Sequence, residues 1–306
     1  VAHHQSEDYN LTTALRQTST GFLFGWVFYI PMYLLGIPAE VVVTVGSLNL
    51  IYQFWVHTEH VPKLGWYEKV FVTPSNHRVH HAQNDLYLDR NYGGVFILWD
   101  RLFGTFQEEL SEAPCIYGIR GPLRSWNPAR AITHIYFDMA RDSWNTARWK
   151  DKFRVWYART GWRPEDVSHR FPRRKNDLDS FKKYDPKINP AVSWYCFAQL
   201  LAVGGLLGYM QGGPLPHMAG VILWGLMFAT TVTTALWLEM HDSDALLWWE
   251  LLRLIGLFSV IFAGYFAGFE SAALVVGTVY GVVNITALPW LGRQAITSSK
   301  MQSVTP

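Results

Sequence analysis

The 306-residue chain contains little charge and few cysteines. Only 16% of its residues are Asp, Glu, Lys or Arg, whereas a typical soluble domain has about 25%. Its two cysteines, Cys115 and Cys196, are too few for a disulfide framework and favour a reducing compartment. Half of the residues are hydrophobic and 16% are aromatic, which excludes a disordered chain and indicates a membrane protein rather than a partner of nucleic acid.

The charge that is present is unevenly distributed. Residues 120–187 hold 17 of the 26 Lys and Arg residues against 8 Asp and Glu residues. A basic stretch beside long uncharged runs predicts a cytoplasmic segment of a membrane protein. Within it, aromatic and basic residues recur at helical spacing between positions 138 and 156. This pattern predicts an amphipathic helix, which lies on the membrane surface or packs against the catalytic region.

Several uncharged runs have the length of a membrane helix, for which about 20 apolar residues are needed. The runs 22–37 and 41–56 are slightly short and predict a membrane hairpin or a partly re-entrant pair. Four more spans are predicted, at residues 191–210, 218–238, 254–269 and 271–292. Between the second and third of these, His241-Asp242-Ser243-Asp244 predicts a loop that ends in a helix N-cap.

These patterns predict an all-α, polytopic (multi-pass) integral membrane protein. The hairpin crosses the membrane and returns, and the four later spans together bring the chain back to the same side. Because the basic stretch is expected in the cytoplasm, the histidine clusters and the C-terminus are expected on the cytoplasmic face as well. The predicted parts are a catalytic region at residues 1–120, which contains the hairpin 22–56, and a basic amphipathic cytoplasmic linker at residues 121–190. A four-span membrane region at residues 191–292 and a polar tail at residues 293–306 follow. The chain opens without Met or a signal pattern, so we expect an upstream part to be missing.

Seven of the eleven histidines fall in three short clusters. The cluster at residues 77–81 reads HxxHH, and in a helix this spacing places the imidazoles on one face. Polar groups at a membrane boundary cost free energy unless they are paired, and there they are often functional. The sequence therefore predicts a metal site, with no catalytic residue beyond its ligands. The predicted metal ligands are His3, His4, His57, His60, His77, His80 and His81.

The number of histidines limits the kind of metal site. Imidazole suits Fe, Zn, Cu and Ni, and one zinc ion takes only three or four protein ligands, so the surplus indicates two metal ions. The lack of thiolates near the clusters excludes an iron–sulfur centre. Spacing alone leaves two irons and two zincs open. Each ligating imidazole also needs a partner for its other nitrogen, and the predicted partners are Glu59, Asn84, Asp85, Asp89, Asn91 and Asp100.

Three motifs in succession carry a family resemblance. They are NHRVHHAQN at 76–84, DRNYGG at 89–94 and WDRLFGTF at 99–106, and together they resemble the fatty acid hydroxylase/sterol desaturase superfamily. The stretch HHQSEDYNL at 3–11 is similar to the end of that family's middle histidine box. The residues around His57 and the TPS at 73–75 look closer to the branch that contains alkylglycerol monooxygenase and bacterial sterol-desaturase-like proteins.

The resemblance implies a membrane-embedded, histidine-ligated di-iron centre that uses O2 to attack a C–H bond of a lipid. The lipid would be a fatty acyl, alkyl-ether or sterol-type molecule, and hydroxylation, desaturation and ether cleavage all fit. It also implies that further ligands lie upstream of residue 1. For His60 the resemblance leaves two roles open, a metal ligand or a residue that positions a ligand.

Two functions from different classes follow. The first is an O2-dependent lipid hydroxylase or desaturase, whose electrons come from outside because the chain has no GxGxxG motif, haem-binding module or cysteine ladder. A cytochrome, a ferredoxin-type protein or a reduced pterin would serve as electron donor, and the basic stretch suits an acidic protein donor. The alternative is a histidine-rich zinc-binding membrane transporter or sensor, which predicts ionisable residues along a path inside the spans.

Overall fold

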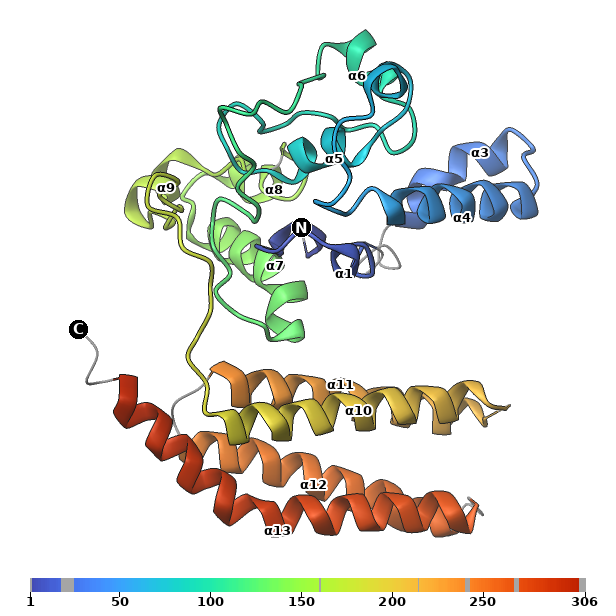
Figure 1. Cartoon of the computed structure of the whole chain (residues 1–306), viewed down its shortest axis with the longest axis vertical. Helices are drawn as coiled ribbons and strands as arrows, with labels where there is room; N and C mark the ends of the chain where they lie inside the picture. Colours follow the sequence, from blue (N-terminus) through green and yellow to red (C-terminus); the bar gives the residue numbers. More distant parts are fainter. Residues whose placement is uncertain are drawn as a thin grey trace. The chain divides into compact units, whose positions relative to one another are not determined.

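The computed structural model describes residues 2–17, 25–159, 161–213, 215–239, 243–266 and 270–302, and these form helices and loops. Within this described part, β-structure is confined to the isolated bridges Phe71–Phe96 and Ala82–Tyr117. The predicted all-α class is confirmed (Figure 1). The chain divides into two compact units, of which unit 1 comprises residues 1–124 and 131–184 and unit 2 comprises residues 125–130 and 185–306.

The N-terminal 184 residues form mostly short helices joined by longer loops. In chain order they are η1 (His3–Gln5), α1 (Leu11–Ala14), η2 (Gly25–Tyr29), α3 (Ile30–Leu34), α4 (Ala39–Trp55), η3 (Gly65–Lys69), α5 (Pro74–His81), α6 (Leu98–Phe103), α7 (Pro128–Asn145), α8 (Trp149–Arg154) and α9 (Glu165–Arg170).

The segment predicted as a membrane hairpin contains η2, α3 and α4, while residues 18–24 lie outside the described part of the chain. Gly36, at φ +81°, turns the chain after α3, and Pro38 directly precedes α4. The 17 residues of α4 extend over about 26 Å, and none of them is buried. An apolar helix without a buried face suits contact with lipid, and the hairpin itself stays a prediction.

Loops around α5 are fixed by a small buried core. Val79 and Tyr87 are fully buried, and the Tyr87 hydroxyl joins two separate loop positions. It donates to the carbonyl of Ala113 at 2.8 Å and accepts from the backbone N–H of Leu110 at 2.9 Å. Because both bonds are made by one rigid ring, the 110–113 loop is held against the helix that carries the HxxHH cluster.

The predicted amphipathic helix over 138–156 is divided into α7 and α8. Asp142 on α7 is 2% exposed and accepts from Arg163 at 2.7 Å and from Arg173 at 2.8 Å. Trp144 and Trp149 stay exposed. The segment therefore packs within unit 1 through its buried carboxylate and still presents aromatic side chains to its surroundings.

Unit 2 contains four helices that are long and apolar enough to cross a membrane, by length and composition (Figure 1). They are α10 (Pro190–Gln211), α11 (His217–Glu239), α12 (Ser243–Phe266) and α13 (Ser271–Gln302). The four spans predicted for this region are confirmed in number among the described residues. Buried side chains from all four helices form the core, among them Cys196, Trp237, Leu246 and Leu291.

The predicted start of the third span at residue 254 is wrong. Helix α12 begins at Ser243, and the candidate span begins at Ala245. The sequence pattern was interrupted by Glu250 and Arg253, but these side chains form an ion pair inside the helical unit and are each 1% exposed. Within an apolar helix bundle, a pair of opposite charges is tolerated, whereas a single isolated charge is not. Of the cap predicted at 241–244, His241 and Asp242 lie outside the described residues.

Candidate metal centre

The HxxHH cluster lies on α5, whose start is set by its own sequence. Thr73 is the N-cap, Pro74 is the first helical residue, and Asn76 completes a capping box. The Thr73 hydroxyl accepts from the Asn76 N–H, and the Asn76 side chain accepts from the Thr73 N–H at 3.1 Å. Such a cap fixes the first turn of a short helix and so the direction of the imidazoles that follow one turn later.

Four imidazoles from three separate segments converge on one point. One ligand atom from each of His3, His57, His77 and His81 lies within 4.8 Å of the others. His3 is on η1, His57 follows the end of α4, and the other two are on α5. The His57, His77 and His81 side chains are at most 4% exposed.

His4 and His80 extend this cluster to six rings. The His4 ring stacks on that of His81 with centroids 4.2 Å apart, and it lies 4.7 Å from the ring of His80. The rings of His77 and His80 are 5.1 Å apart. The structure therefore gathers six of the seven predicted ligands. His60 is exposed, and its described contact is a backbone N–H that donates to Thr58 Oγ1.

Backbone carbonyls set the tautomers of these rings. His3 Nδ1 lies 2.8 Å from the Thr13 carbonyl, and His57 Nδ1 lies 2.7 Å from the Gln53 carbonyl. A carbonyl oxygen only accepts, so in the neutral ring each Nδ1 carries the proton and each Nε2 carries a bare lone pair. His80 Nδ1 faces the Arg90 carbonyl at 3.3 Å and follows the same pattern.

The bare nitrogens then face one another. Nε2 of His57 lies 3.1 Å from Nε2 of His3 and 3.1 Å from Nε2 of His77. The lone pairs on Nε2 of His57 and His3 repel at this distance unless a cation lies between them. Nitrogens that ligate one transition-metal ion at about 2.0–2.1 Å are separated by roughly 3 Å, so the observed spacing fits shared metal ligation.

Two further ring nitrogens in the cluster have no hydrogen-bond partner among the described residues. His77 Nδ1 and His81 Nε2 are buried and make no hydrogen bond. A buried polar atom without a partner costs free energy. A metal ion in the cluster would satisfy His81 Nε2, whereas His77 turns its other nitrogen, Nε2, toward His57. Burial also lowers the pKa of His3 to about 4 and that of His4 to about 2, with the neighbouring imidazoles adding to the shift. Neutral imidazole is the form that binds metals.

Of the predicted partners for the imidazoles, Asn91 and Asp100 contribute most to the local framework. The Asn91 amide donates to the carbonyls of Asn76 and Gln107, which ties α5 to the 105–107 segment. Asp100 accepts from the backbone N–H groups of Tyr92 and Gly93 and from the Thr105 hydroxyl. These side chains therefore hold the backbone that carries the Arg90 carbonyl facing His80.

The other four predicted partners have different surroundings. Asn84 donates to the Pro114 carbonyl and accepts from the Ile116 N–H, and Asp85 is exposed and pairs with Arg120. Asp89 adopts a positive φ of 57° in a turn. Burial raises the pKa of the Tyr117 hydroxyl, and the nearby Glu59 carboxylate adds to this shift. The described partners of the ligand rings are thus backbone carbonyls, which side-chain identity does not reveal.

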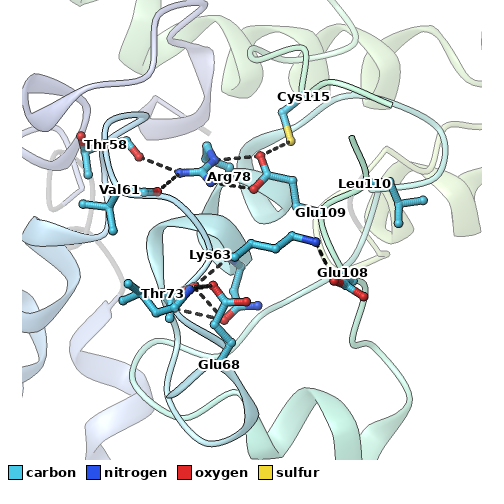
Figure 2. Close-up of polar contacts among 12 residues, drawn as sticks. Thr58, Val61, Lys63, Glu68, Thr73, Arg78, Glu108, Glu109, Leu110 and Cys115 are labelled. Carbon is cyan, nitrogen blue, oxygen red and sulfur yellow. Dashed lines mark hydrogen bonds and ion pairs between the residues drawn. The ribbon is translucent and has the colours of Figure 1, made fainter. Parts of the chain in front are cut away.

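The sequence patterns did not single out Arg78, which lies between two of the predicted ligands on α5. Its guanidinium donates to both carboxylate oxygens of Glu109, at 2.8 and 2.6 Å, and to the carbonyls of Thr58 and Val61, at 3.1 and 3.0 Å (Figure 2). Arg78 is 7% exposed. One side chain therefore attaches the loop after His57 to α5. The signal in the sequence was an arginine inside a histidine box.

Comparisons with known proteins agree with this geometry. Residues 1–105 match the family model described as fatty acid hydroxylase. The chain is 43% identical to human alkylglycerol monooxygenase over 162 residues, which are 53% of this chain and 36% of that protein. It is 40% identical to alkylglycerol monooxygenase of Xenopus tropicalis over 205 residues, which are 66% of this chain and 45% of that protein.

A bacterial relative is more distant. Ornithine lipid hydroxylase OlsE of Rhizobium tropici is 33% identical over 92 residues, which are 30% of this chain and 28% of that protein. The chain thus spans less than half the length of the alkylglycerol monooxygenases that it matches. No solved structure matches the chain.

Proposed function

Because residues 1–105 of this chain match the fatty acid hydroxylase family model, we propose that the protein is a membrane-bound, non-haem di-iron oxidoreductase that uses O2 to oxidise a C–H bond of a lipid. The observation that carries the proposal is the set of imidazole nitrogens from three segments that face one another at 3.1 Å. The proposed ligands on this chain are His3, His4, His57, His77, His80 and His81, without His60.

The chemistry is divided between the metal and the protein. Bound iron would supply O2 activation with externally delivered electrons, a task to which redox-active iron is suited and redox-inactive zinc is not. The carbonyls of Thr13 and Gln53 hold the Nδ1 protons of His3 and His57 and aim the Nε2 atoms inward. Burial of His57 and His81 keeps water away from the ligand atoms, and Arg78 holds the His57 loop in place.

The substrate proposal is a lipid that carries an alkyl or acyl chain. Two of the relatives are named for alkylglycerols and for ornithine lipids, and both kinds of lipid have such a chain attached to a polar head group. An alkylglycerol is accordingly the first substrate to test, with hydroxylation or desaturation of one of its C–H bonds as the proposed reaction. The four candidate spans of unit 2 suit an enzyme that meets its substrate within the bilayer.

Electrons would come from a separate donor, a reduced pterin or a small redox protein. The stretch 120–187 carries 17 Lys and Arg residues against 8 Asp and Glu residues, so its net positive charge favours an acidic donor protein. The same charge supports a cytoplasmic position for this stretch and, with it, for the histidine centre.

The experiment is purification of the full-length protein under anaerobic conditions, followed by metal analysis and turnover with 18O2. We expect about two irons per chain and one labelled oxygen in the lipid product. His80→Ala should lose metal and turnover together. Stoichiometric zinc, with no O2 uptake in the presence of reductant and lipid, would instead support a zinc-binding transporter or sensor.

A further inference from the structure

A cavity of about 550 Å³ lies among the helices of unit 2. All four helices contribute to its wall, which is mostly aliphatic and includes Leu206, Leu223, Met227, Leu257 and Val276. Cavities of roughly 300–1,000 Å³ with apolar walls and few polar groups are typical of small-molecule sites. The wall belongs to unit 2 alone, so this cavity is separate from the histidine cluster of unit 1.

At one end of the cavity, the lining residue Tyr280 belongs to a polar network. Tyr280 lines the cavity, accepts a hydrogen bond from Arg253 at 2.6 Å and donates one to Gln199. Arg253 is paired with Glu250, which also accepts from the Tyr195 hydroxyl at 2.6 Å. Because the guanidinium and the carboxylate neutralise each other, this end carries no net charge for a ligand to pair with.

The other end of the cavity carries Glu270. This residue directly precedes α13, lines the cavity and is exposed. Along α13, about 15 Å separate it from Tyr280. An ionised carboxylate accepts hydrogen bonds and repels anions. A ligand head group at this mouth is therefore one that donates hydrogen bonds and carries no negative charge.

We propose that this cavity binds the hydrocarbon chain of a neutral single-chain lipid, with a hydroxyl-bearing head group at Glu270 and the chain directed toward Tyr280. The aliphatic wall can make close van der Waals contacts with a hydrocarbon chain, as apolar side chains make with one another in a packed core. The carboxylate at the mouth selects against fatty acids and anionic phospholipids by charge. Lipid binding by unit 2 is a function in addition to the oxidation proposed for unit 1.

Two adjacent glycines on α10 allow a matched test. Gly205 lines the cavity, whereas Gly204 does not. A Cβ added at either position meets no heavy atom within 4 Å, so neither substitution clashes at its first carbon. The probe is a monoacylglycerol with a photoreactive diazirine in its chain, applied to the full chain in phosphatidylcholine nanodiscs, and labelled peptides are identified by mass spectrometry.

We expect labelling of peptides from α10 and α13. Gly205→Leu should reduce it by about tenfold, because the new side chain fills the space that the lipid chain needs, and Gly204→Leu should leave it unchanged. Circular dichroism of both variants verifies that the helices are intact. Equal labelling of the two variants would overturn the proposal.

The selectivity of the mouth is tested with a photoreactive fatty acid of the same chain length. The wild-type protein should label more weakly with the fatty acid than with the monoacylglycerol, and Glu270→Gln should remove the difference. Fatty acid labelling as strong as that by the monoacylglycerol in the wild type would contradict the assignment of the head group. Labelling requires neither iron nor O2, so its outcome is independent of the oxygenase proposal.

Discussion

Tyr9 donates a hydrogen bond from its hydroxyl to the carbonyl of Val56 at 2.9 Å, across 47 positions of the chain. Tyr9 is 4% exposed, and its ring lies 5.6 Å from that of His57 and 5.2 Å from that of His81. This single bond joins the segment that carries the first two histidines of the cluster to the residue directly before the third. It therefore fixes the approach of two ligand-bearing segments.

The first prediction concerns Tyr9→Phe. Removal of the hydroxyl leaves the Val56 carbonyl without a partner, so the free energy of unfolding should fall by about 1–3 kcal/mol. Iron content should fall with it, because the His3 segment is less firmly held. Thermal unfolding and metal analysis measure both effects. Tyr157→Phe, at an exposed position, is the control and should change neither quantity.

The second prediction separates two histidines. His81→Ala removes a buried ring that lies at the centre of the cluster, so metal affinity should fall by about 100-fold or more. His60→Ala removes an exposed ring and should leave metal content and turnover unchanged. Metal titration of both variants decides the matter, and loss of metal in His60→Ala would return that residue to the ligand set.

The third prediction concerns the Arg78–Glu109 pair. Arg78→Gln leaves the Glu109 carboxylate without its bidentate partner, and the free energy of unfolding should fall by about 3 kcal/mol. The double variant Arg78→Gln/Glu109→Gln should recover part of this loss, because no charge is then left unpaired. Chemical denaturation of the single and double variants gives the coupling energy. A coupling near zero would show that the two side chains act independently.

The fourth prediction concerns the buried ion pair of α12. Arg253→Met leaves Glu250 charged and surrounded by helices, so the variant should lose about 3–5 kcal/mol of stability. Arg253→Met/Glu250→Leu replaces both charges with apolar side chains and should be close to the wild type. Thermal unfolding in detergent compares the three proteins. A double variant as unstable as the single one would assign the loss to Tyr280 and Asn284, which also receive hydrogen bonds from Arg253.

The sequence predicted the parts of this protein that depend on local spacing. The HxxHH cluster is on a helix because Thr73, Pro74 and Asn76 form a local start signal. The apolar runs of unit 2 are helices because their length and composition allow little else in a membrane. Both features arise within a single segment, so a single segment is enough to predict them.

The features that were missed depend on contacts between segments. Arg78 reads as one more charge in a motif until the fold places Thr58 and Glu109 against it. The start of α12 was misplaced because Glu250 and Arg253 look like the polar boundary before an apolar run until they are seen to pair. The partners of the imidazole Nδ1 atoms are main-chain carbonyls, which every residue type has, so no side-chain pattern could indicate them.

The spacing of the histidines along the chain has a consequence for biogenesis. His3 and His57 are 54 positions apart, and His77 follows 20 positions later. A nascent polypeptide cannot chelate an ion at this centre until all three stretches have left the ribosome and closed on one another, which costs chain entropy. Capture of the proposed metal ion would offset that cost and contribute to the final folding step. Cells starved of the ion would accordingly accumulate a loosely closed apoprotein, which quality-control proteases would recognise.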